Sequence, residues 1–248
     1  MFTDRRRRRA ARRRAGRSTL RLLRREAWSA ARRQWRQLLG MLAVWTALTI
    51  GFAWLQRTEF LQGLTAGFMI GVLGLFAMVF LVGTGVAHRW MGANAEQWTA
   101  ELFDDLDGGR WFVAHDVGFE AMNIDHVLVG PQRIYAVETK WTTWQGNPKF
   151  IQGAQACAER ASRKLRALLK SHDLHREVWP LVIVWGPGTK EMQAKVSWQQ
   201  GVGLVAGIHA DTWLPELRSS GRDLARDLSA ERAITDYIAA RDAYAAAS

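Results

Sequence analysis

The chain has 248 residues and a formal net charge of +11, enough length for one domain of moderate size plus an extension. Residues 1–37 hold 15 arginines against only Asp4 and Glu26, a net charge of +13, so the remaining residues carry −2. The basic character therefore belongs to a tail. The single cysteine, Cys157, excludes an internal disulfide and is too few for a thiolate metal site.

Residues 1–37 form the first predicted segment, an arginine-rich tail followed by a basic amphipathic helix. Residues 1–16 are too densely charged to bury a core, so we expect them to be unfolded alone. In residues 18–38 apolar side chains recur every three or four positions, with arginines between them. This pattern predicts contact with anionic membrane lipids or nucleic acid. The alternative is a solvated tail that only sets membrane orientation.

Residues 38–87 form the second predicted segment, a transmembrane hairpin. Residues 38–55 and 60–87 are both uncharged and long enough to cross a bilayer as helices. Basic residues flank both outer ends, which predicts that both termini are cytoplasmic. We expect the protein in a membrane, of the bacterial inner (cytoplasmic) type.

A stripe of glycines marks the second predicted span. Gly63, Gly67 and Gly71 are four residues apart, so they lie on one helix face and allow a close helix approach. This stripe predicts packing against the first span. The alternative is self-association into a homo-oligomer.

Residues 88–248 alternate between helical and strand patterns. The expected helices and strands, in order, are a helix at 91–107, strands at 111–115, 127–129, 134–137, 178–185 and 201–206, and helices at 150–170, 211–218 and 222–247. The pattern predicts an α/β domain, a mixed sheet flanked by helices. We place the domain at 88–215 and a C-terminal helical segment at 216–248.

The chemistry concentrates in residues 123–141, two strand-like runs around a Gly-Pro turn. Glu138 and Lys140 are two residues apart, so their side chains leave the same face of a strand. With Asp125 from the neighbouring strand and the carbonyl of Thr139, they supply oxygen ligands suited to Mg²⁺ or Mn²⁺. Lys140 could orient or deprotonate a water, or stabilise a phosphate. The alternatives are a surface ion pair of Glu138 with Lys140 and a turn cap at Asp125.

Two further residues are candidates for nucleic-acid contact. Trp141 could stack on a base, although an aromatic side chain near a strand end also serves packing. Lys149 begins a basic helix that could contact backbone phosphates, or could be a solvated face.

The sequence around these residues resembles a known family. Residues 92–96, 123–131 and 134–141 are similar to the nuclease-related domain (NERD) family, placed in the PD-(D/E)xK endonuclease superfamily, and the resemblance covers about residues 90–210. It implies a restriction-endonuclease-like fold and metal-dependent phosphodiester hydrolysis, with DNA expected before RNA.

The resemblance also assigns roles to residues. It gives Asp125, Glu138 and Lys140 the metal and water roles, and makes Glu96 a further ligand or supporting group. A helix glutamine of the family corresponds to Gln152, with Gln155 as the alternative. Ile124 stands where the superfamily has proline. The competing hypothesis is a non-catalytic, membrane-tethered module that binds nucleic acid or protein.

Overall fold

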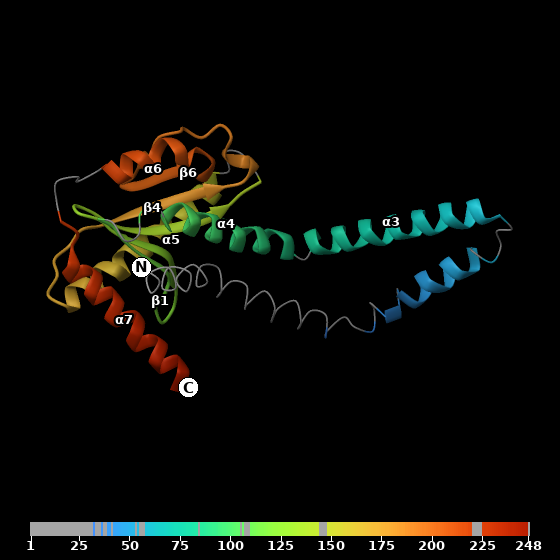
Figure 1. Ribbon diagram of the computed structural model, residues 1–248, viewed down its shortest axis with the longest axis horizontal. Coiled ribbons are helices and arrows are strands. Elements are labelled where there is room, and N and C mark those ends of the chain that lie inside the picture. The colour runs from blue at the N-terminus through green and yellow to red at the C-terminus, as the bar shows by residue number, and fades with distance from the viewer. Residues whose placement is uncertain are drawn as a thin grey trace, which may run out of the picture. The chain divides into compact units, whose positions relative to one another are not determined.

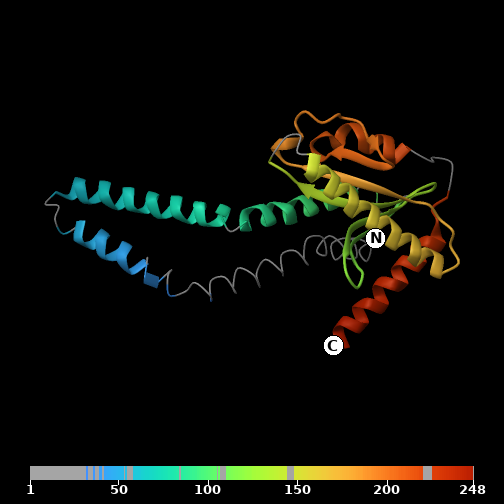
Figure 2. The ribbon, with the colours of Figure 1, turned by 180° about the vertical axis from the view of Figure 1, so that it is seen from behind.

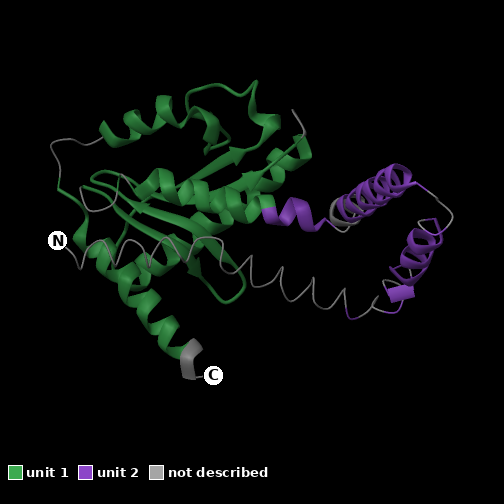
Figure 3. Cartoon of the chain, turned by 45° about the vertical axis from the view of Figure 1, so that its right-hand side comes forward, with its two compact units in different colours: residues 1–18, 91–248 green, residues 19–90 purple. Residues whose placement is uncertain are grey.

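The computed structural model of the chain describes residues 32, 36, 39–40, 42–52, 54, 58–83, 85–104, 106, 110–143, 148–219 and 225–247. The predicted tail and amphipathic helix therefore lie outside the described residues, apart from Arg32 and Arg36, and so does the loop at 144–147. The chain divides into two compact units, residues 19–90 and residues 91–248 with residues 1–18 (Figure 3).

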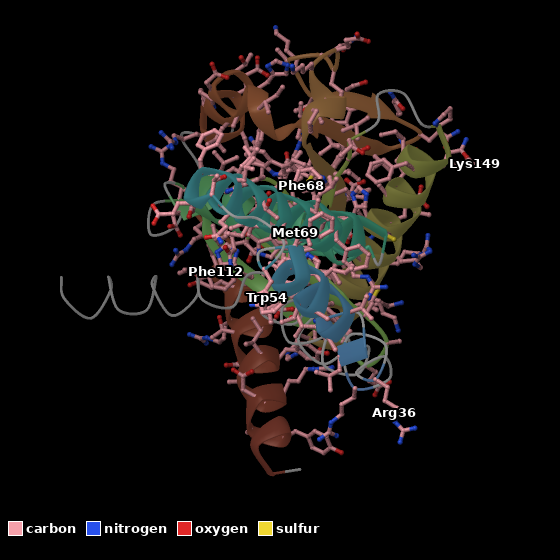
Figure 4. All side chains as sticks on the ribbon, turned by 90° about the vertical axis from the view of Figure 1, so that its right-hand side faces the viewer. Arg36, Trp54, Phe68, Met69, Phe112 and Lys149 are labelled. Atoms are coloured by element: carbon pink, nitrogen blue, oxygen red, sulfur yellow. The ribbon has the colours of Figure 1, made fainter. Side chains whose placement is uncertain are left out.

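The unit of residues 19–90 contains one described helix that is long and apolar enough to cross a membrane. This helix, α3, spans Glu59–Gly83, and its apolar part is Glu59–Met78, of which nothing is buried inside the unit. Phe68, near the middle of α3, is exposed (Figure 4). The apolar helix Leu42–Phe52 is shorter. The second predicted span is therefore present as a helix, and the two-helix hairpin is not confirmed.

No described atom lies close to the glycine stripe. A Cβ built on Gly63, Gly67 or Gly71 would meet no described heavy atom within 4 Å. No described residue of the first predicted span comes within 4 Å of these Cβ positions, so packing against that span and self-association into a homo-oligomer both stay predictions.

The unit of residues 91–248 is built on a mixed sheet, as predicted. Its described strands are β1 (Phe112–Gly118), β2 (Asn123–Val129), β3 (Ile134–Trp141), β4 (Val178–Trp185), β5 (Ser197–Gln199) and β6 (Val202–Ala206). The six strands are ordered β1-β2-β3-β4-β6-β5. Pairs β1–β2, β2–β3 and β5–β6 are antiparallel, whereas β3–β4 and β4–β6 are parallel. The sequence pattern missed β5 because it has only three residues.

Helices cover both faces of this sheet (Figures 1 and 2). They are α4 (Val86–Asp104), α5 (Pro148–Ser171), α6 (Ala210–Ser219) and α7 (Leu228–Ala247), with short 3-10 helices η1 (Pro187–Thr189) and η2 (Gly207–His209). On one face, α5 packs on Val182, Val184 and Leu204, and α5 with α7 packs on Val127 and Ala136. On the other face, Phe103 of α4 and Trp213 of α6 pack on the odd-numbered side chains of β3 and β4. Alternating burial on two faces produces this three-layer arrangement.

The carboxyl ends of β3 and β4 are joined closely. The Thr142 N–H donates to the Trp185 carbonyl at 2.9 Å. Gly186 has φ of +104°, and a Cβ there would collide with the Thr142 carbonyl oxygen. Only glycine combines this backbone conformation with so close an approach. The carboxyl ends of β3 and β4, next to Lys140, are therefore held together by backbone contacts.

Candidate active site

The predicted acidic residues meet across the β2–β3 pair. His126 is paired with Val137, and the same antiparallel register continued by one residue places Asp125 opposite Glu138. Directly opposite side chains share a face, and Lys140 shares it with Glu138 because it is two residues further along β3. This is the face covered by α5, since Glu138 and Lys140 lie beside Val182 and Val184 in the parallel register.

The Asp125 carboxyl has a perturbed pKa. Partial burial raises its pKa well above the ordinary value, and the negative charges of Glu138 and Glu96 raise the pKa further. The Lys140 charge and the Thr139 N–H, which donates to Asp125 Oδ2 at 2.7 Å, oppose this rise without cancelling it. Asp125 is therefore harder to ionise than an ordinary carboxyl, because burial and two neighbouring carboxylates disfavour its negative charge.

Lys140 forms the ion pair that the sequence left as an alternative. Its Nζ donates to Glu138 Oε1, and the Glu138 side chain is only 8% exposed. Burial acts to lower the pKa of Lys140, but the charges of Glu138 and Asp125 more than offset it and raise the pKa above its ordinary value. Lys140 is therefore an ammonium at neutral pH, which favours charge neutralisation over proton abstraction from water.

Helix α4 brings Glu96 to the same cluster. Glu96 lies close enough to Asp125 for its charge to raise the Asp125 pKa. One turn later, the buried Thr99 hydroxyl contacts Thr139 Oγ1 at 3.2 Å and accepts a hydrogen bond from Trp185 Nε1 at 2.8 Å. Thr99 thus anchors α4 to β3 and β4. The sequence pattern missed Thr99 and Trp185, because no local signal shows which residues of α4, β3 and β4 meet.

The donor set suits a hard cation without enclosing one. Among the described residues, no group of three or more His, Cys, Asp or Glu side chains is arranged to hold a metal ion. Mg²⁺ needs only one or two carboxylates, with waters and substrate oxygens completing its shell. A cation held by Asp125 and Glu138 would offset the burial and repulsion that disfavour the charge of Asp125. The metal role of the Thr139 carbonyl stays a prediction, because the contacts found for Thr139 involve its N–H and its hydroxyl.

The segment that carries this site matches a known protein family. Residues 91–185 match the nuclease-related domain (NERD) family. The matched NERD segment begins in α4, ends with β4 and contains Glu96, Asp125, Glu138 and Lys140. No curated protein matches the chain, and no solved structure matches it. The match confirms the resemblance over residues 91–185 and indicates a nuclease-related function for this part of the chain.

The two candidate glutamines of the NERD segment differ in their environment. Gln155 on α5 is 8% exposed, and its Nε2 lies 3.5 Å from Gln199 Oε1. Gln152, the residue chosen from sequence, is exposed one turn earlier. Both line a cavity of about 460 Å³ on the α5 face of the sheet. Burial favours Gln155 as the positioned amide.

The other predicted nucleic-acid contacts, Trp141 and Lys149, have different environments. Trp141 points to the opposite sheet face, where its ring lies 6.0 Å from that of Trp98 and lines a second cavity of about 760 Å³. Lys149 is exposed at the start of α5 and extends away from the ribbon (Figure 4). Trp141 therefore packs among aromatic side chains, and contact of the exposed Lys149 with nucleic acid stays a prediction.

Proposed function

We propose that this protein is a metal-dependent nuclease that hydrolyses phosphodiester bonds of DNA, or of RNA, next to a membrane. The observation that carries the proposal is the convergence of Glu96, Asp125, Glu138 and Lys140 within a segment that matches the nuclease-related domain. Three carboxylates around one lysine destabilise the fold, because their mutual repulsion opposes folding. A purely structural role therefore explains the cluster poorly.

Each residue of the acidic cluster has a separate proposed role. Asp125 and Glu138 would hold Mg²⁺ or Mn²⁺, which when bound polarises a phosphate and lowers the pKa of a bound water. The ammonium of Lys140 would neutralise charge that develops on the phosphate, exchanging its contact with Glu138 for one with the substrate. Glu96 would orient a water or a ligand from the α4 side. The proton of the water would pass to solvent or to a carboxylate, because the raised pKa of Lys140 leaves it without a free lone pair.

The test uses the full-length protein, solubilised in detergent, on plasmid DNA with and without Mg²⁺. We expect Mg²⁺-dependent cleavage, with Glu138→Ala and Lys140→Ala each lowering the rate by about 100-fold or more, the cost of removing one preorganised charge. The matched control is Glu159→Ala, which breaks the exposed Glu159–Arg163 pair on α5 and should leave the rate unchanged. Cleavage that persists in both active-site variants would sink the assignment.

A membrane anchor belongs to the same proposal. Helix α3 supports it by length and composition. We infer a location in the bacterial inner membrane with both termini in the cytoplasm, where the arginine-rich tail would contact anionic lipids and the domain would meet DNA.

A second candidate function is a non-catalytic module that holds nucleic acid or protein at the membrane. The Glu138–Lys140 ion pair favours it, because a paired carboxylate is less available to a cation. DNA retention on filters without cleavage at any Mg²⁺ or Mn²⁺ concentration would support this function over hydrolysis.

A further inference from the structure

The cavity on the α5 face has an unusual lining. Four glutamines line it, Gln152 and Gln155 from α5 and Gln199 and Gln200 from the β5–β6 hairpin, and we call it the glutamine pocket. The apolar side chains of Ile151, Met192 and Leu204 complete much of its wall. None of its described lining residues is charged. Its volume of about 460 Å³ falls in the range of small-molecule sites, roughly 300–1,000 Å³.

The glutamine pocket adjoins the acidic cluster on the same face of the sheet. Val184, which lines the pocket, is the register neighbour of Lys140, and Thr142 lines it two residues after Lys140. Helix α5, which carries Gln152 and Gln155, also comes close to Lys140, because the Cys157 thiol lies near enough to Lys140 to affect its pKa. A polymer bound at Lys140 would therefore reach the glutamine pocket with a neighbouring unit.

The lining selects the chemistry of that unit. A neutral wall offers a phosphate no cation to neutralise its charge, whereas apolar side chains suit the faces of a planar ring. Each glutamine amide offers one acceptor and two donors, and such an amide pairs with the N6 and N7 edge of adenine. The Gln155–Gln199 and Gln199–Ser197 contacts are both 3.5 Å long, so these amides can turn to a ligand at little cost.

The β5–β6 hairpin, which carries Gln199 and Gln200, has a strained turn. Gln200 and Gly201 form the turn between β5 and β6, with φ of +51° and +80°. Two successive positive φ values define a tight hairpin turn in which asparagine or glycine is preferred at the first position. A long side chain there costs stability, and residues held in such conformations cluster at functional sites. The hairpin also lies outside the residues that match the nuclease-related domain.

We propose that the glutamine pocket binds a nucleobase, adenine in preference to a pyrimidine, of the strand whose phosphate lies at Asp125, Glu138 and Lys140. The proposal rests on the proposed function for the position of the phosphate. The β5–β6 hairpin then selects which bond is cut, and the carboxylate cluster carries out the cutting.

The first test measures binding without any reaction. Deoxyadenosine monophosphate and thymidine monophosphate are titrated into the full-length protein in detergent without divalent cations, and the Kd values are measured by calorimetry. We expect the adenine nucleotide to bind about tenfold more tightly, the discrimination of one good amide–base pair. Gln199→Ala and Gln200→Gly should each bring the ratio close to one. The control Gln132→Ala, in the exposed turn between β2 and β3, should leave the ratio unchanged.

Gln200→Gly separates a binding role from a structural one. Glycine relieves the positive φ, so this variant should melt at the same temperature as the wild type or higher while losing the adenine preference. Equal binding of both nucleotides by the wild type, or an adenine preference that survives both substitutions, would overturn the proposal. Adenine binding in a chain that cleaves no DNA would leave the pocket standing and remove only the nuclease function.

Discussion

At the scale of single residues, Asp125 shows how the site opposes folding. Its folded pKa is raised, so protonation of Asp125 stabilises the fold below about pH 4, the unfolded pKa, and this contribution is lost as the pH rises. We expect Asp125→Asn to melt a few degrees higher than the wild type at pH 7, since about 1 kcal/mol corresponds to roughly 2–4 °C in a chain of this size.

Two further measurements check the expected rise in melting temperature of Asp125→Asn. The difference in melting temperature should shrink as the pH falls towards 4, where the wild-type carboxyl is protonated. Millimolar Mg²⁺ should raise the melting temperature of the wild type but not that of the variant. A variant that is less stable than the wild type at pH 7 would contradict the charge argument.

A buried histidine pair makes a second prediction at the same scale. His115 Nδ1 and His126 Nδ1 lie 2.7 Å apart, and His126 Nε2 is buried without a hydrogen-bond partner among the described residues. Burial lowers the pKa of His126 well below the ordinary value, and His115 adds to this effect. A lowered pKa stabilises the fold above about pH 6.5, the unfolded pKa, and this stability is lost as the pH falls.

The measurement is the free energy of unfolding in urea between pH 7.5 and 5.5. His126 contributes up to about 1.4 kcal/mol per pH unit to the slope of this free energy against pH, which is the value for one proton. We expect His126→Leu to lower the pH dependence of the unfolding free energy by this amount, independently of its effect on the absolute free energy of unfolding. The control His172→Leu, at an exposed position after α5, should keep the wild-type slope.

At the scale of elements, one residue starts α7 and ties it to the domain. Asp227 Oδ1 accepts a hydrogen bond from the Ala230 N–H at 3.1 Å, and Asp227 Oδ2 pairs with Arg176 Nε at 2.6 Å. Burial would raise the pKa of Asp227, but these two partners outweigh it and lower the pKa. The contribution of Asp227 to stability is therefore present above about pH 4 and is lost as the pH falls further.

Asp227→Ala should cost about 1–2 kcal/mol at pH 7, from the lost helix cap and a partly exposed ion pair. Asp227→Asn keeps a capping side chain and should cost less than half of that. Urea unfolding at pH 7 measures both variants. Equal losses in the two variants would show that the cap contributes nothing.

At the scale of the whole molecule, the proposed membrane anchor depends on α3. Phe68 lies near the middle of Glu59–Met78, and an arginine there should cost about 2.5–3.5 kcal/mol of insertion free energy. We expect Phe68→Arg to move the protein from the carbonate-resistant membrane fraction to the soluble or aggregated fraction. Phe60→Arg, at the N-terminal end of α3, should cost much less if that end lies near the membrane surface. Extraction of the wild type by carbonate would disprove the anchor.

The sequence alone predicted the local features of this protein. Strand-like runs on either side of Gly130-Pro131 became β2 and β3, and the i, i+2 spacing put Glu138 and Lys140 on one face. The long helix α5 followed from its repeat of alanine and leucine. These features depend on the backbone geometry and side-chain periodicity of neighbouring residues, which a sequence contains directly.

Only the tertiary structure decided which distant residues meet. The insertion of β4 between β3 and β6 placed the β5–β6 hairpin beside α5, and so brought Gln199 to Gln155. The same packing joined Thr99 of α4 to Thr139 of β3. Such contacts depend on strand order and on the burial of both sheet faces, which are properties of the whole chain and have no local signal in the sequence.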